Sequence, residues 1–177
     1  MVITGGTSGK PVDVNNENEL LVRAIVETEL EHSSAKQGTA FSWVSSDSDI
    51  DAGDTRLFIK NTSITPLILD RATFSPANVD CVWSVNLGKT TTTPTGTVVT
   101  GANISQSGSV AEALAYDDET AVIDGTPIDY VTTETTGNLQ HSLDGVILKK
   151  GHYIQINQET ESASGRVVVI GHYANPD

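Results

Sequence analysis

The chain has 177 residues, and 23 acidic against ten basic side chains give it a formal net charge of −13 at pH 7 and a pI of about 4.5. This charge argues against nucleic-acid binding, because contacts to phosphate need clustered Lys and Arg. A single cysteine excludes an intrachain disulfide, and no apolar run approaches the roughly 18 residues of a membrane-spanning helix.

The first 19 residues are expected to form an extended N-terminal arm. They are polar, contain three glycines and Pro11, and lack the basic and apolar regions of a signal peptide. Fully extended, an arm of this length could reach about 60 Å, whereas the alternative is a frayed terminus. Residues 20–177 would then form one β domain, which suits the length of the chain.

The rest of the chain is rich in Thr, Ser, Val, Ile and Gly and poor in helix-forming stretches, which predicts strands joined by turns. Residues 20–32 (LLVRAIVETELEH) fit a helical stripe, but their alternation and β-branched residues favour a strand. Residues 109–116 are predicted as a strand and could instead form a short helix. The other predicted strands are residues 40–44, 56–61, 66–74, 79–87, 97–100, 145–148, 153–158 and 166–173.

Many short strands with glycine-marked turns and no crossover helices predict an all-β fold, an antiparallel β-sandwich or a jelly-roll-like barrel. Residues 89–97 (KTTTTPTGT) are expected to form an exposed hairpin tip or loop. Residues 117–144 are polar and Thr-rich, with few apolar anchors, and are expected to form one long loop. A loop of this length suggests a contact with another subunit or a receptor. The alternative is a surface loop with one more short strand in it.

The acidic stretch DSDIDAGDTR is the one candidate metal site. Asp47, Asp49 and Asp51 match the first three ligands of a helix–loop–helix calcium site. However, the glycine falls at position 7 instead of 6, position 12 is Phe58, and no helix is expected on either side. The stretch is therefore interpreted as a turn that leads into a strand, with Asp54 capping the turn. A non-standard calcium site made by the four aspartates is kept as the alternative.

No catalytic motif or cofactor site is recognised, and no enzyme activity is predicted. Cys81 lies between apolar neighbours and is expected to be buried and inert. Trp43 and Trp83 lie in apolar strand patterns and are expected in the core, although aromatic residues on a β face could stack against a sugar. Asn61 and Asn103 begin glycosylation sequons, which are interpreted as chance matches.

Three stretches resemble accessory virion proteins of tailed bacteriophages. The longest is GTAFSWVSSDSDIDAGDTRLFIKNTSITPLILDRATFS, residues 38–75. The others are GTVVTGANIS, residues 96–105, and LDGVILKKGHYIQI, residues 143–156. In such proteins this strand-and-turn pattern opens a β-sandwich that decorates the capsid or forms part of the tail. The resemblance brings no catalytic residues with it.

The resemblance implies a non-enzymatic structural protein of the virion, an outer capsid decoration (cement) protein that binds at capsomer junctions and stabilises the phage head. Its partners would be the major capsid protein and copies of itself, as a homotrimer, with residues 1–19 and 117–144 making the contacts. The expected location is the capsid exterior, after synthesis in the host cytoplasm, with no nucleic-acid or membrane partner. The alternatives are a tail or head–tail component, a carbohydrate- or receptor-binding module, and a β-sandwich enzyme.

Overall fold

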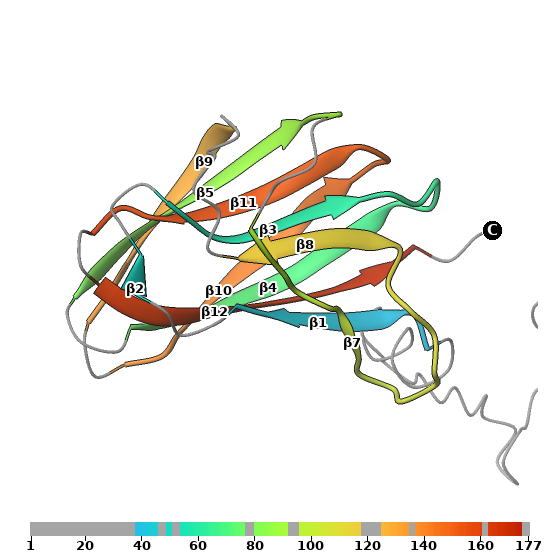
Figure 1. Ribbon diagram of the computed structural model, residues 1–177, viewed down its shortest axis with the longest axis horizontal. Helices are drawn as coiled ribbons and strands as arrows, with labels where there is room; N and C mark the ends of the chain where they lie inside the picture. The colour runs from blue at the N-terminus through green and yellow to red at the C-terminus, as the bar shows by residue number, and fades with distance from the viewer. Residues whose placement is uncertain are drawn as a thin grey trace, which may run out of the picture.

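In the computed structural model the chain is an all-β protein with two antiparallel sheets packed against each other, as the sequence predicts (Figure 1). The structure describes residues 38–45, 49–50, 54–76, 80–91, 96–117, 125–134, 137–160 and 163–174. The expected arm and the strand expected at residues 20–32 lie outside these ranges. Within them, no helix is long and apolar enough to cross a membrane.

The described residues form twelve strands, and each of the nine strands expected after residue 38 overlaps one of them. Residues 109–116 contribute a strand and not a helix. The strands are β1 (Ala40–Val44), β2 (Asp49–Ile50), β3 (Thr55–Asn61), β4 (Leu67–Pro76), β5 (Cys81–Lys89), β6 (Thr97–Val98), β7 (Ala102–Asn103), β8 (Ala113–Asp117), β9 (Thr126–Thr133), β10 (Leu139–Leu148), β11 (His152–Gln158) and β12 (Ala163–Tyr173).

The strands are divided into two six-stranded sheets. Sheet A has the order β10-β4-β12-β1-β7, with β2 paired to β12, and sheet B has the order β6-β8-β3-β11-β5-β9. Four pairings are nested in the chain: β1 with β12, β3 with β11, β4 with β10, and β5 with β9. Because successive nested pairs fall in opposite sheets, the topology is that of a jelly roll.

β5 and β9 are the nested pair with the shortest separation in sequence, and the segment between them contains β6, β7 and β8. It contributes β7 to the edge of sheet A, where it pairs with β1, and β8 to sheet B, where it pairs with β3. The connection expected at residues 89–97 joins β5 to β6, and residues 92–95 lie outside the described ranges.

Alternate side chains of the central strands fill the space between the sheets, as the two-residue period of a strand requires. Leu57 and Ile59 of β3, and Val167 and Val169 of β12, are fully buried and belong to one apolar cluster. This cluster draws on both sheets, so the sandwich has a single core.

Both tryptophans lie in this core, which confirms the sequence prediction. The Trp83 ring centroid lies 5.5 Å from that of Phe74, and its Nε1 donates a hydrogen bond of 2.9 Å to Thr133 Oγ1. Cys81 is also fully buried, as expected. Burial raises the pKa of its thiol, which disfavours the reactive thiolate.

The expectation of one long loop over residues 117–144 is wrong, because β9 and the first part of β10 lie in this interval. β9 forms the edge of sheet B, and its first five residues are exposed, so it lacks the alternation that marks a half-buried strand. Pro127 and a bulge opposite Val85 and Asn86 interrupt its pattern further. The structure agrees better with the alternative, a surface segment that contains another strand.

Candidate functional site

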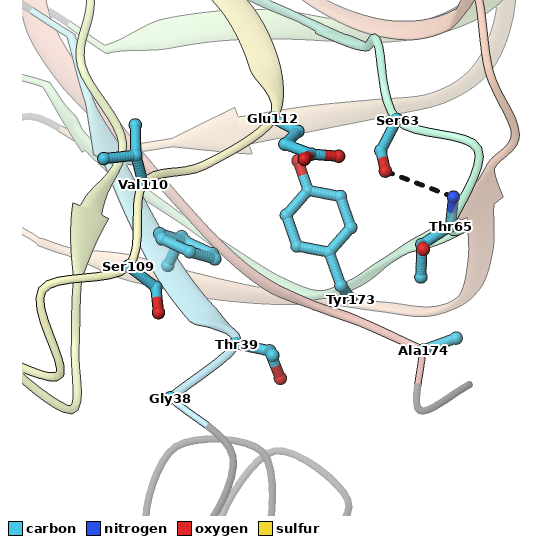
Figure 2. Close-up of a pocket in the computed structure, with 10 residues that line it drawn as sticks. Gly38, Thr39, Ser63, Thr65, Ser109, Val110, Glu112, Tyr173 and Ala174 are labelled. Atoms are coloured by element: carbon cyan, nitrogen blue, oxygen red, sulfur yellow. Dashed lines mark hydrogen bonds between the residues drawn. The ribbon is translucent and has the colours of Figure 1, made fainter. Parts of the chain in front are cut away.

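Two adjoining cavities lie at one end of the sandwich, where β1 and β8 begin and β3 and β12 end. The larger one, the tyrosine cavity, has a volume of about 230 Å³ (Figure 2). It is lined by Gly38, Thr39, Phe41, Ser63, Thr65, Ser109, Val110, Glu112, Tyr173 and Ala174. The smaller one, the valine cavity, has a volume of about 150 Å³ and lies between residues 98–101 and 110–116. Val110 lines both cavities.

Main-chain hydrogen bonds hold the end of β12 at the tyrosine cavity. The Tyr173 N–H donates to the Thr39 carbonyl oxygen at 3.1 Å, which extends the pairing of β1 with β12. The next residue, Ala174, donates to the Pro66 carbonyl oxygen at 2.9 Å. The wall formed by Thr39, Tyr173 and Ala174 is therefore fixed to both neighbouring strands of sheet A.

Asn61 holds the turn between β3 and β4. Its side chain is fully buried, and its Nδ2 donates to the carbonyl oxygens of Thr65 at 2.9 Å and Leu148 at 2.7 Å. Its Oδ1 accepts from the Ser63 N–H at 2.8 Å, which makes an Asx turn. The sequon at this position therefore serves the fold, and the amide nitrogen that would carry a glycan is enclosed.

Asn103 holds the opposite wall in a similar way. Its Nδ2 donates to the Gly38 carbonyl oxygen at 2.7 Å, and its Oδ1 accepts from the Ser105 N–H at 3.0 Å. The same Nδ2 lies 3.1 Å from the hydroxyl of Ser107. Both sequon asparagines thus make Asx turns that shape the tyrosine cavity.

Glu112 is anchored by its main chain, while its side chain is exposed. Its carbonyl oxygen accepts two hydrogen bonds from Thr62, one from the N–H at 3.0 Å and one from Oγ1 at 2.7 Å. These bonds join the segment before β8 to the turn after β3. The carboxylate can therefore be altered without removing the contacts that hold this segment.

Tyr173 projects from the end of β12 into the tyrosine cavity, toward Glu112 (Figure 2). Its side chain packs edge-to-face on Phe41, with ring centroids 5.8 Å apart. Its hydroxyl is buried and has no hydrogen-bond partner, and the same holds for Thr39 Oγ1. Burial raises the pKa of Tyr173, and the Glu112 carboxylate raises it further.

Gly101 closes the base of the valine cavity over Trp43. A Cβ at this position would lie 2.6 Å from Trp43 Nε1 and 2.9 Å from the Cβ of Ala111, so only glycine fits without a shift. The Trp43 indole N–H beneath it is buried and has no hydrogen-bond partner. The valine cavity is therefore an apolar depression with a tryptophan beneath its base.

The three most exposed large apolar side chains of the described residues border these cavities. Ile64 is 85% exposed, Val110 is 77% exposed and Val98 is 70% exposed. Ile64 stands between two residues of the tyrosine cavity wall, and Val98 and Val110 line the valine cavity. We call these three side chains, with the two cavities, the contact end.

The calcium candidates fall largely outside the described ranges. Asp47 and Asp51 are not described, and Asp49 is described only as a residue of β2, opposite Ser164. Asp54 directly precedes β3, and its carbonyl oxygen accepts from the Gln158 N–H at 3.0 Å. The expectation that a strand follows this stretch is confirmed by β3, whereas the residues of the expected turn that directly precede Asp54 lie outside the described ranges. Among the described residues, no group of three or more His, Cys, Asp or Glu side chains could hold a metal ion.

Two histidines pair with aspartates at separate places in the sandwich. His141 Nε2 lies 3.3 Å from Asp129 Oδ2, and His172 Nδ1 lies 3.0 Å from Asp70 Oδ2. The first pair joins the edge strands β9 and β10, and the second joins β4 and β12. The structure therefore does not bring the histidines of these two pairs into one site.

The sequence predictions did not include the contact end, because its walls come from five segments that only the folded chain brings together. The two N-x-S tripeptides after strand-like stretches were the available signal, since Asn with Ser two residues on is typical of an Asx turn.

No protein-family model matches the chain, and neither a curated protein nor a solved structure gives a significant match to it.

Proposed function

We propose that this chain is a non-enzymatic structural protein of a virus particle, an outer capsid decoration protein, and that it attaches through its contact end. The observation that carries the proposal is the gathering of Ile64, Val98 and Val110 around two cavities at one end of the sandwich. Single exposed apolar side chains need no explanation, but a group of them is typical of a protein–protein interface.

The fold is compatible with this function and does not select it alone. Jelly rolls occur in viral capsid proteins, lectins and cupins. The resemblance of residues 38–75 to accessory virion proteins favours the first class. The carbohydrate-binding alternative was suggested by Trp43 and Trp83, and both are fully buried, so they cannot stack against a sugar.

The proposed partners are the major capsid protein and further copies of this chain in a homotrimer. A trimer that touches several capsomers at once binds by avidity, so each contact end needs only modest affinity. The net negative charge would keep free trimers soluble and apart from one another before they reach the particle.

The test compares the full chain with the double variant Ile64→Ser/Val110→Ser for binding to purified heads that lack the protein. If both side chains are buried on binding, their truncation should weaken binding at least about tenfold. The matched control is Ile128→Ser/Tyr130→Ser, which truncates exposed apolar side chains on β9. β9 is one edge strand of sheet B, and β6 and β8 lie at the other side of that sheet.

The proposal predicts that the contact-end variant loses occupancy on heads while the β9 variant keeps it, with both variants unchanged in circular dichroism and melting temperature. Binding of purified protein to tails and not to heads would favour the tail component instead. Equal occupancy by both variants would refute the role of the contact end. Sedimentation of the free protein as a monomer at all concentrations would refute the trimer.

A further inference from the structure

We infer that the tyrosine cavity receives an ammonium group, the side chain of a lysine that the partner protein presents to the contact end. This inference rests on the proposed function for the identity of the partner, a protein surface, but the chemistry of the cavity can be tested without that partner.

The cavity is a built site with unused acceptors. Tyr173 is only 7% exposed, and its hydroxyl has no hydrogen-bond partner. Thr39 Oγ1 is likewise buried and unpartnered. Unpaired buried polar atoms are uncommon in folded proteins and each calls for an explanation, one of which is a ligand that completes the site. Both oxygens can accept a hydrogen bond from a donor placed in the cavity.

The charge of the cavity wall selects a cation. Glu112 supplies a carboxylate beside the Tyr173 hydroxyl (Figure 2), and none of the described lining residues is Lys, Arg or His. An anion would meet the carboxylate without a compensating positive charge. A cation between Glu112 and Tyr173 would instead form a charge-assisted hydrogen bond with the carboxylate. The net charge of −13 would also attract a basic partner at long range.

The shape and the walls select lysine over arginine. An ammonium group has three donors and no acceptor, and it can turn to meet single oxygens on different walls. A guanidinium group is planar and rigid, so once it forms a bidentate pair with the Glu112 carboxylate it has less freedom to turn toward the single oxygens of Tyr173 and Thr39. Val110 lines the cavity and can contact the apolar stem of a lysine.

The experiment titrates the full chain with n-butylammonium chloride and follows the backbone amide signals by NMR at constant ionic strength. We expect saturable shifts of the Val110 and Tyr173 amides in the wild type. Glu112→Gln should weaken binding at least about tenfold, since it removes the charge. Its main-chain bonds to Thr62 are independent of the side chain, so the variant should fold.

The matched control is Glu134→Gln, which removes an exposed carboxylate at the end of β9 and should leave the affinity unchanged. Two further probes have the same chain length: neutral n-butanol and anionic butyrate should not cause these shifts. Equal binding of n-butanol and n-butylammonium, or equal affinity of wild type and Glu112→Gln, would overturn the inference. Absence of any saturable shift with n-butylammonium would also overturn it.

The outcomes separate this inference from the proposed function. If heads bind Glu112→Gln as well as wild type while Ile64→Ser/Val110→Ser fails to bind, the lysine inference falls and the contact end stands. If n-butylammonium binds in a Glu112-dependent way while Ile64→Ser/Val110→Ser keeps full occupancy on heads, the cavity chemistry stands and the proposed attachment falls.

Discussion

Replacing Asn61 with alanine should destabilise the protein by about 2–4 kcal/mol. The substitution removes three hydrogen bonds, to the carbonyl oxygens of Thr65 and Leu148 and from the Ser63 N–H. Each such bond contributes about 0.5–1.5 kcal/mol net, and a buried group left unpaired costs about 1–3 kcal/mol. For a chain of this length the loss corresponds to a fall in Tm of roughly 5–15 °C. Of the three hydrogen bonds, the one to the Leu148 carbonyl oxygen should contribute most to this loss, because it is fully buried.

Urea unfolding followed by tryptophan fluorescence measures this loss, because both tryptophans are buried in the folded state. The m-value should stay unchanged, since the same surface is exposed on unfolding. Asn103→Ala is the matched comparison: Asn103 makes the same Asx turn, but three of its bonds are exposed to water, so it should cost less than about 1 kcal/mol. If Asn61→Ala costs no more than Asn103→Ala at equal m, the buried asparagine does not hold the turn.

Three further predictions concern the buried polar groups Trp83 Nε1 and the Tyr173 hydroxyl. Thr133→Val should cost about 1–3 kcal/mol, because it leaves the buried Trp83 indole N–H without its acceptor; Thr133→Ser keeps the hydroxyl, and urea unfolding of the two variants should separate them. The Tyr173 pKa in the folded state lies above its ordinary value of 10.0, so the neutral phenol favours folding below about pH 10, and this contribution is lost as the pH rises beyond that value. Melting curves between about pH 9 and 11 should therefore fall more steeply for wild type than for Tyr173→Phe. Glu112→Gln should lower the Tyr173 pKa toward its ordinary value, seen as tyrosinate absorbance at lower pH, and an unchanged titration would contradict the influence of the carboxylate.

The strands with regular alternation could be predicted from the sequence. Residues 40–44 were predicted with the bounds that β1 has, and Phe41 and Trp43 in this strand are buried whereas Ser42 and Val44 are less buried. The tryptophans and Cys81 could be placed in the core for the same reason. In these strands a local pattern reports directly on which face of the sheet is buried.

The strands between residues 126 and 144 could not be predicted, because their pattern is broken locally. β9 carries Pro127 and five successive exposed residues at a sheet edge. β10 pairs irregularly between Ser142 and Val146, and Gly145 within this bulge has a positive φ of 89°. An edge position removes one buried face and a bulge shifts the period, so neither strand alternates as a central strand does.

The contact end could not be predicted from the sequence, because no local pattern encodes it. Thr39 and Tyr173 lie at opposite ends of the described chain and meet only because β1 pairs with β12. The unpaired hydroxyl of Tyr173 is likewise a property of its surroundings and not of its neighbours in sequence. Tertiary contacts between distant segments, and not residue spacing, create this site.

The position of β12 has a consequence for how the protein can be made. β12 follows every other described strand in the chain, yet it lies between β4 and β1 in the middle of sheet A. While the ribosome is still adding residues, at about 5–20 per second, sheet A can exist only as two separate pieces, β10 with β4 and β1 with β7. Until Tyr173 has been synthesised, the edges of β4 and β1 that face β12 remain unpaired and the part of sheet B that β12 covers stays open, so a chain released earlier would expose strand edges and apolar surface that promote aggregation.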